Sequence, residues 1–186
     1  LKPMRILIVE PYMTGSHAEW AQGYAAHSAH DVELLTIPGR HWKWRMHGGA
    51  VTLADRFRKR GLEPDLIVAS DMLDFATFIA LAGPAARRAA GAVYFHENQL
   101  SYPWPEGDPD PGLGRDAHYG FVNYTSALAA DAVFFNSCYH MESFLGSLPR
   151  FLGNFPDYTG TENIPAIEEK GRVLHLGLDL AGLDRC

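Results

Sequence analysis

The sequence predicts an α/β fold built on a doubly wound, Rossmann-like parallel sheet. Short apolar runs rich in β-branched and aromatic residues alternate with longer helical segments, and this strand–helix–strand alternation repeats five times. The strand-like runs are apolar at nearly every position, which is typical of parallel strands covered on both faces. Repeated strand–helix–strand units favour the doubly wound arrangement.

Length and composition agree with one globular domain. The chain has 186 residues, of which 47% are hydrophobic and 20% charged. Sixteen Lys and Arg against 22 Asp and Glu leave a net charge of −6. This charge excludes a generic nucleic-acid coat but leaves a local basic patch open. The two cysteines, Cys138 and Cys186, exclude a disulfide scaffold and a four-cysteine zinc site.

Nothing in the sequence predicts a membrane partner. No apolar run approaches the roughly 18 residues of a membrane span, and Met4 leads straight into a strand-like run without a signal-peptide pattern. We therefore expect a cytoplasmic protein. The sequence predicts no oligomeric state.

Six strands are expected at the apolar runs, each bounded by turn residues or by a polar segment. They are residues 5–9, 32–37, 66–69, 92–95, 132–135 and 172–176.

Five helices are expected between these strands. Ser16 follows Gly15 as a candidate cap, Gly61 ends the second helix, and Pro84 must end or kink the third. The predicted ranges are 16–30, 50–61, 72–88, 116–130 and 137–146. The breaker-rich segment 102–114 is too long for a plain connector and favours a lid or binding loop, and 154–164 forms a second loop.

Ligands of such sheets bind beyond the carboxyl ends of the strands, so the residues that follow each strand matter most. After the first strand, Gly15 permits a tight turn, and a cap at Ser16 would leave backbone N–H groups facing an anion. An ordinary turn and cap is the alternative. The segment lacks the GxGxxG pattern of dinucleotide sites.

Two tryptophans follow the second strand, interleaved with basic residues. Trp42 and Trp44 alternate with Arg40, Lys43 and Arg45. Aromatic faces stack on sugars or bases, and cations bind phosphates. The alternative is that one tryptophan packs into the core among solvated cations.

Four hydrogen-bonding side chains follow the fourth strand directly: His96, Glu97, Asn98 and Gln99. His96 or Glu97 could orient or deprotonate a hydroxyl group, whereas the alternative is a turn held by side-chain-to-backbone bonds. The HENQL run lacks the second histidine of HExxH, so no metal is expected.

Further candidates lie near the fifth strand. Asn136 and Ser137 stand at a strand end and helix start, where a cap is the simpler reading, and Glu142 could be a solvated acid. His118 and Asn123 could reach the site from one helix or lie at the surface. The basic run 56–60 is typical of a solvated face, and an RNA contact is the alternative. His27, His30, His47 and His175 show no ligand spacing.

Taken together, the motifs resemble the N-terminal domain of the tRNA-queuosine α-mannosyltransferase family. The resemblance runs from Met4 to about Leu178. The chain departs from the family pattern at Lys43, where histidine is usual, at His140, where asparagine is frequent, and in the insert 108–114. The shared motifs are GSH at 15–17, WKWR at 42–45, YFHENQLSYP at 94–103, YG at 119–120 and FNSCYHMESF at 135–144.

This resemblance implies a GT-B glycosyltransferase, in which two Rossmann-like halves face a cleft. Residues 4–178 would form the N-terminal, acceptor-side half, 179–186 would begin the crossover, and the donor-binding half would lie outside this chain. Alone, the chain would then be inactive. The implied reaction is retaining transfer of mannose from GDP-mannose to queuosine in tRNA, with no metal or other cofactor.

The resemblance also implies roles for residues. His96 and Glu97 would be catalytic, beside the acceptor hydroxyl and the sugar. Other residues would bind substrates. Gly15 and Ser16 would lie against the donor phosphates, Trp42, Trp44 and Arg45 would face the acceptor, and Asn136, Ser137 and Glu142 would shape the cleft wall. The remaining substrate-binding residues would be His17, Arg40, Asn98, Gln99 and Tyr119.

Two other functions stay open from the residues alone. One is a stand-alone flavodoxin-like module that binds a nucleotide or effector without catalysis, although no phosphate-loop signature supports it. The other is a hydrolase using His96 and Glu97, for which no GxSxG motif or metal spacing is present.

Overall fold

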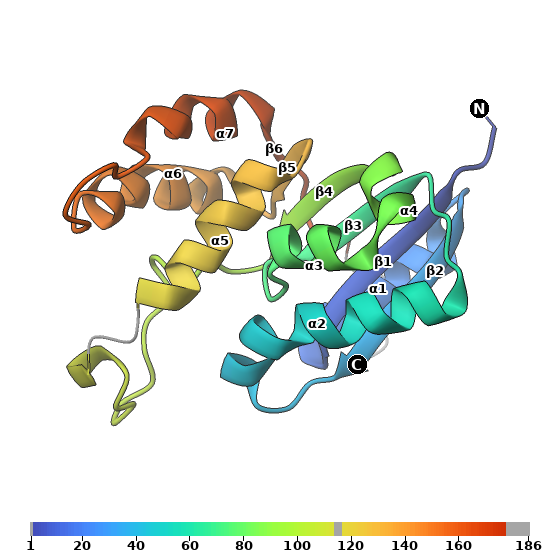
Figure 1. The fold of residues 1–186 in the computed structure, drawn as a ribbon, viewed down its shortest axis with the longest axis horizontal. Helices are drawn as coiled ribbons and strands as arrows, with labels where there is room; N and C mark the ends of the chain where they lie inside the picture. Colours follow the sequence, from blue (N-terminus) through green and yellow to red (C-terminus); the bar gives the residue numbers. More distant parts are fainter. Residues whose placement is uncertain (1, 114–116, 178–186) are drawn as a thin grey trace, which may run out of the picture.

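A computed structural model describes residues 2–113 and 117–177. It confirms the α/β class: six strands form one all-parallel sheet in the order β2-β1-β3-β4-β5-β6. Helices α2, α3 and α5 pack beside one another on one face, and α1 lies behind the sheet against β1 and β2 (Figure 1). The expected doubly wound topology is therefore present.

The six strands lie close to their predicted positions: β1 Arg5–Met13, β2 Asp31–Pro38, β3 Leu66–Ser70, β4 Ala90–Phe95, β5 Ala132–Phe135 and β6 Gly171–Val173. The α-helices are α1 Gly15–His27, α2 Trp42–Arg60, α3 Phe75–Ala82, α4 Pro84–Arg88, α5 Ala117–Ala129, α6 Cys138–Leu152 and α7 Ile164–Lys170. Two 3₁₀ turns, η1 Pro111–Leu113 and η2 Thr161–Asn163, complete the described elements.

Successive side chains of each strand point to opposite faces of the sheet and contribute to an apolar layer on each face. Leu7 and Val9 of β1 join the large cluster beneath α2, α3 and α5, whereas Ile6 and Ile8 are buried outside it. Tyr94 of β4 is buried and stacks on Trp20 of α1, with ring centroids 4.8 Å apart. Both faces of the sheet are therefore covered, which explains why its strands are apolar at almost every position.

Several helix boundaries differ from the sequence expectation. Helix α2 begins at Trp42 rather than residue 50, so the tryptophan-rich segment is helical and not a loop. The predicted helix 72–88 is two helices that meet at Gly83, whose φ is 93°, just before Pro84. Helix α6 continues to Leu152, and α7 was not predicted. Tertiary packing explains the greater length of α6, because side chains of this helix beyond Gly146 are buried.

Within residues 2–113 and 117–177, no helix is long and apolar enough to cross a membrane.

Strand β1 lies between β2 and β3, so the connections leave it in opposite directions. A crevice beyond the carboxyl ends of the strands is expected where the strand order reverses in this way. Glu10 lies in the last part of β1, Asp71 directly follows β3 and His96 directly follows β4. The sheet thus brings these three polar residues to one edge.

Candidate functional site

The buried centre of this edge is an ion pair between Glu10 and His17. Glu10 is fully buried, and His17, from the first turn of α1, donates from Nδ1 to Glu10 Oε2 at 2.9 Å. The other carboxylate oxygen accepts the backbone N–H of Tyr12 at 2.7 Å. Loss of one partner would leave an uncompensated buried charge, which typically costs about 3–5 kcal/mol.

The imidazole of His96 lies in an aromatic enclosure beside this pair. Its ring centroid is 4.2 Å from that of His17 and 4.9 Å from those of Trp20 and Tyr94. Both ring nitrogens are buried without a hydrogen-bond partner among the described residues. Burial, together with the positive charge of His17, lowers the pKa of His96 to about 3, so the imidazole is neutral near pH 7.

The acidic and basic groups of the edge have perturbed pKa values. Burial opposes the charge on His17, but the hydrogen bond to Glu10 and the charge of Asp71 raise its pKa to about 9. Burial raises the pKa of Asp71 to about 7, against the opposing charge of His17. Burial also raises the pKa of Glu97. Such a cluster of shifted pKa values in one place is typical of functional sites.

Three side chains from separate elements hold the backbone of the loop after β4. Asp71 Oδ1 accepts the N–H of His96 at 2.8 Å, and Asn136 Nδ2 donates to the carbonyl of the same residue at 2.8 Å. Asn123 of α5 accepts the N–H of Gln99, also at 2.8 Å. These bonds fix the 96–99 loop at both ends.

The predicted site residues of this loop form two groups, one buried and one partly exposed. Asn98 is buried and turns inward, where its Oδ1 accepts the N–H groups of Leu100 and Ser101 at 3.1 Å each. Glu97 and Gln99 are partly exposed, and the Gln99 amide donates to Glu97 Oε1 at 3.2 Å. Asn98 therefore shapes the turn, whereas Glu97 and Gln99 are left at the surface of the edge.

The start of α1 differs in detail from the expectation. Its N-cap is Thr14, without a side-chain cap bond, and Ser16 lies in the first turn instead of capping the helix. Gly15 has a φ of 51°, the left-handed conformation that a tight turn requires. Gly15 and Ser16 are exposed, so this helix start carries N–H groups that no side chain caps.

The aromatic residues predicted to face an acceptor form a second cluster, at the start of α2. The ring of Trp42 lies 5.1 Å from that of Tyr119 and 5.9 Å from that of Trp104, and Tyr119 is buried. Trp44 is 63% exposed. Trp42 therefore packs inward while Trp44 faces solvent, which agrees with the alternative that one of the two tryptophans packs into the core. Tyr12 joins this cluster to the His96 enclosure, because it packs against the cluster and its ring centroid lies 6.1 Å from that of His17.

Lys43 ties this second cluster to the long loop. Its Nζ lies 2.6 Å from a carboxylate oxygen of Asp108 and 2.6 Å from one of Asp110. Asp110 also accepts a bond from the Tyr119 hydroxyl at 3.3 Å. Lys43 is thus paired with two acids of the long loop.

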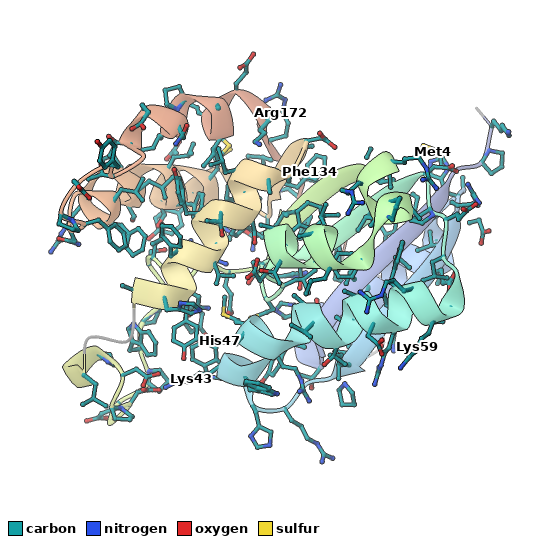
Figure 2. The ribbon with its side chains drawn as sticks, viewed as in Figure 1. Met4, Lys43, His47, Lys59, Phe134 and Arg172 are labelled. Carbon is teal, nitrogen blue, oxygen red and sulfur yellow. The ribbon has the colours of Figure 1, made fainter. Side chains whose placement is uncertain are left out.

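The other cations near α2 have different surroundings. Arg40 is exposed, and the Nε of Arg45 donates to the carbonyl of Pro38 at 3.2 Å. The basic run 56–60 lies toward the far end of α2, as the labels of Lys43, His47 and Lys59 in Figure 2 show. Lys59 pairs with Asp55 at 2.7 Å. The four cations of this run are exposed, whereas Phe57 between them packs into the core, which agrees with the solvated-face interpretation.

The cap predicted between β5 and α6 is confirmed. Ser137 is the N-cap of α6, and its side chain accepts from the N–H of His140 at 3.1 Å. Asn136 Oδ1 lies 3.1 Å from Nδ1 of His140, so both side chains of the junction are engaged within the fold. Glu142 is exposed on α6.

Sequence reasoning missed three residues of the enclosure: Glu10, Asp71 and Trp20. Glu10 and Asp71 could have been found, because each follows a run of buried strand residues and carries a charge at the expected edge. Trp20 carries no such signal, since a helical tryptophan is usually packing.

One group at the edge has donors suited to a metal ion. Ligand atoms of Glu10, His17 and His96 all lie within 4.8 Å of one another. Two histidines and a carboxylate are a known zinc donor set. Here two of the three donors are already joined in an ion pair, so a cation would have to displace the proton of His17.

Comparison with known proteins shows the family of this chain. Residues 5–178 match the family model described as tRNA-queuosine alpha-mannosyltransferase N-terminal. A tRNA-queuosine alpha-mannosyltransferase of Drosophila melanogaster is 36% identical over 171 residues, which are 91% of this chain and 44% of the relative. The chain thus spans less than half the length of that relative. It belongs to the tRNA-queuosine alpha-mannosyltransferase N-terminal family.

Proposed function

We propose that this chain is the acceptor-side domain of a retaining glycosyltransferase that transfers mannose from GDP-mannose to queuosine in tRNA. The observation that supports it most is the family match over residues 5–178, since the motifs that define the edge all lie inside it. The name of the fly relative agrees with the same reaction. Donor binding is assigned mainly to a second half outside this chain.

The electrostatics of the edge suit a reaction in which a diphosphate leaves. Negative charge builds on the leaving phosphate, and catalysis then depends on oriented dipoles and positive groups. Gly15 and Ser16, at the uncapped start of α1, offer backbone N–H groups for that charge. His17, with its pKa raised to about 9, adds a buried positive charge in the same turn.

The acceptor hydroxyl is assigned to Glu97 and His96. A general base works best when its pKa lies near the operating pH, and a pKa near 3 makes His96 a poor proton acceptor. We therefore assign the proton to Glu97, whose pKa is raised and whose side chain is partly exposed. His96, with both ring nitrogens unpartnered, would orient the hydroxyl by a hydrogen bond when substrate binding opens the aromatic enclosure around its ring.

The test is an assay of the longest open reading frame that contains this chain. The protein is incubated with GDP-mannose and queuosine-containing tRNA, and the nucleoside masses are read. We expect a gain of one hexose, which His96→Ala and Glu97→Ala abolish in folded protein. His27→Ala is the matched control, because that histidine is exposed at the end of α1.

Two results would contradict the proposal in different ways. A protein that binds GDP-mannose but leaves the tRNA unchanged would refute the acceptor. A protein that transfers mannose equally well without either side chain would refute the assignment of His96 and Glu97.

A further inference from the structure

Two adjoining hollows, which we call the aromatic groove, lie between the start of α5, the loop beyond residue 99 and the segment after α6. Their volumes are about 420 and 490 Å³, and both are lined by Ala117 and Phe155. Figure 1 shows the start of α5 between the yellow-green loop and the end of α6. The main lining residues are Gln99, Tyr102, Trp104, Phe121, Phe155 and Tyr158.

Tyr158 is the most unusual residue of the groove. Its side chain is 98% exposed, and its backbone is left-handed with a φ of 45°. This conformation is unfavourable for a bulky side chain and persists only where the surroundings impose it. The backbone nearby is held by the hydroxyl of Tyr124, which donates to the carbonyl of Gly160 at 3.0 Å. Tyr158 therefore lies in solvent beside the groove, at a left-handed position of the backbone.

The chemistry of the lining favours a flat, uncharged ligand. None of the residues that line the two hollows in the described part of the chain is a lysine or an arginine, so the lining carries no strong phosphate ligand. Six aromatic side chains line the two hollows, and the amides of Gln99 and Asn154 and the carboxylate of Asp157 add polar groups. Faces for stacking with polar groups at the edge match a nucleobase, and RNA-binding proteins commonly stack unpaired bases on aromatic side chains.

The groove is continuous with the edge of the sheet. Gln99 lines the groove, while its amide donates to Glu97 and its N–H is held by Asn123. A ligand in the groove therefore lies beside the 96–99 loop. We propose that the aromatic groove binds an unstacked nucleobase of the acceptor RNA, a neighbour of the nucleoside that is modified; this inference rests on the proposed function.

The test measures RNA binding to the longest open reading frame by fluorescence anisotropy, with fluorescently labelled queuosine-containing tRNA. Loss of one stacked base typically weakens binding roughly 5- to 150-fold, so we expect this increase in Kd for Tyr158→Ala. Tyr158→Trp keeps an aromatic face and should bind as the parent does. Tyr139→Ala is the matched control, since Tyr139 is 80% exposed on α6 but does not line the groove.

Each alternative gives a distinct result. If Tyr158→Ala transfers mannose and binds tRNA as the parent does, the groove proposal is overturned while the proposed function stands. If Tyr158→Ala and Tyr139→Ala weaken binding equally, the effect is general and the groove is again excluded. Unchanged RNA binding with a changed oligomeric state would overturn the proposal and show that a second copy of the chain covers the groove. Failure of the parent to bind tRNA would overturn both proposals.

Discussion

Replacing Asp71 by asparagine should make the stability of the variant, relative to the parent, increase as the pH rises. Asp71 is fully buried, its Oδ2 has no hydrogen-bond partner among the described residues, and burial raises its pKa from 3.8 to about 7. The unfolded chain therefore loses this proton at lower pH than the folded protein does. Stability falls as pH rises from about 3.8 to 7 and the loss is then complete.

The size of the effect follows from the shift. Each pH unit between the two pKa values costs about 1.4 kcal/mol, so the ionisation of Asp71 removes about 2–3 kcal/mol of stability between pH 5 and pH 8. Asp71→Asn removes this dependence, and its amide oxygen can still accept the N–H of His96. The stability of the variant relative to the parent should therefore rise by about 2–3 kcal/mol over that range.

Urea unfolding at pH 5, 6, 7 and 8 measures this difference directly. The cost of burying the asparagine amide does not depend on pH. It therefore cancels when the difference in unfolding free energy between variant and parent at one pH is compared with the difference at another. Asp157→Asn is the matched control, because that carboxylate is exposed. A difference between Asp71→Asn and the parent that stays the same from pH 5 to pH 8 would refute the reasoning, since it would mean that Asp71 is ionised and compensated in the fold.

Two further predictions concern packing and the long loop. A Cβ on Gly49 of α2 would lie 2.8 Å from a side-chain carbon of Pro11, so Gly49→Ala should destabilise by about 1–3 kcal/mol. Gly23→Ala in α1 meets no atom within 4 Å and should stabilise by up to about 1 kcal/mol; equal thermal shifts would exclude the packing argument. Lys43→Met should make the segment 99–113 several-fold more sensitive to limited proteolysis, whereas Lys59→Met should not. Equal cleavage would mean that the lysine does not hold the loop.

The sheet could be predicted well because its signal is local. A strand buried on both faces must be apolar at nearly every position, and each such run is readable in the sequence. Helix ends were predicted less well. The tryptophan segment 42–45 contains no helix-breaking residue, yet its two tryptophans and two cations resemble a binding segment until the contacts of Trp42 with Trp104 and Tyr119 are known.

The candidate site was predicted in part. The strand-end rule led to His96 and Glu97, because polar side chains directly after a buried run are conspicuous. The partners of the 96–99 loop were not predicted as such: Asp71 and Asn123 hold its backbone from distant parts of the chain. The low pKa of His96 also depends on its enclosure by Trp20 and Tyr94, which lie on different elements.

The sequence by itself determined the fold class, the order of the strands along the chain and the family motifs, since hydrophobic periodicity and turn residues act over a few neighbours. Only the tertiary structure decided the charge states and the contacts. Glu10 pairs with His17, Lys43 pairs with Asp108 and Asp110, and Tyr158 stands in solvent at the groove. Burial and distance set these properties, and both depend on segments that meet only when the sheet assembles.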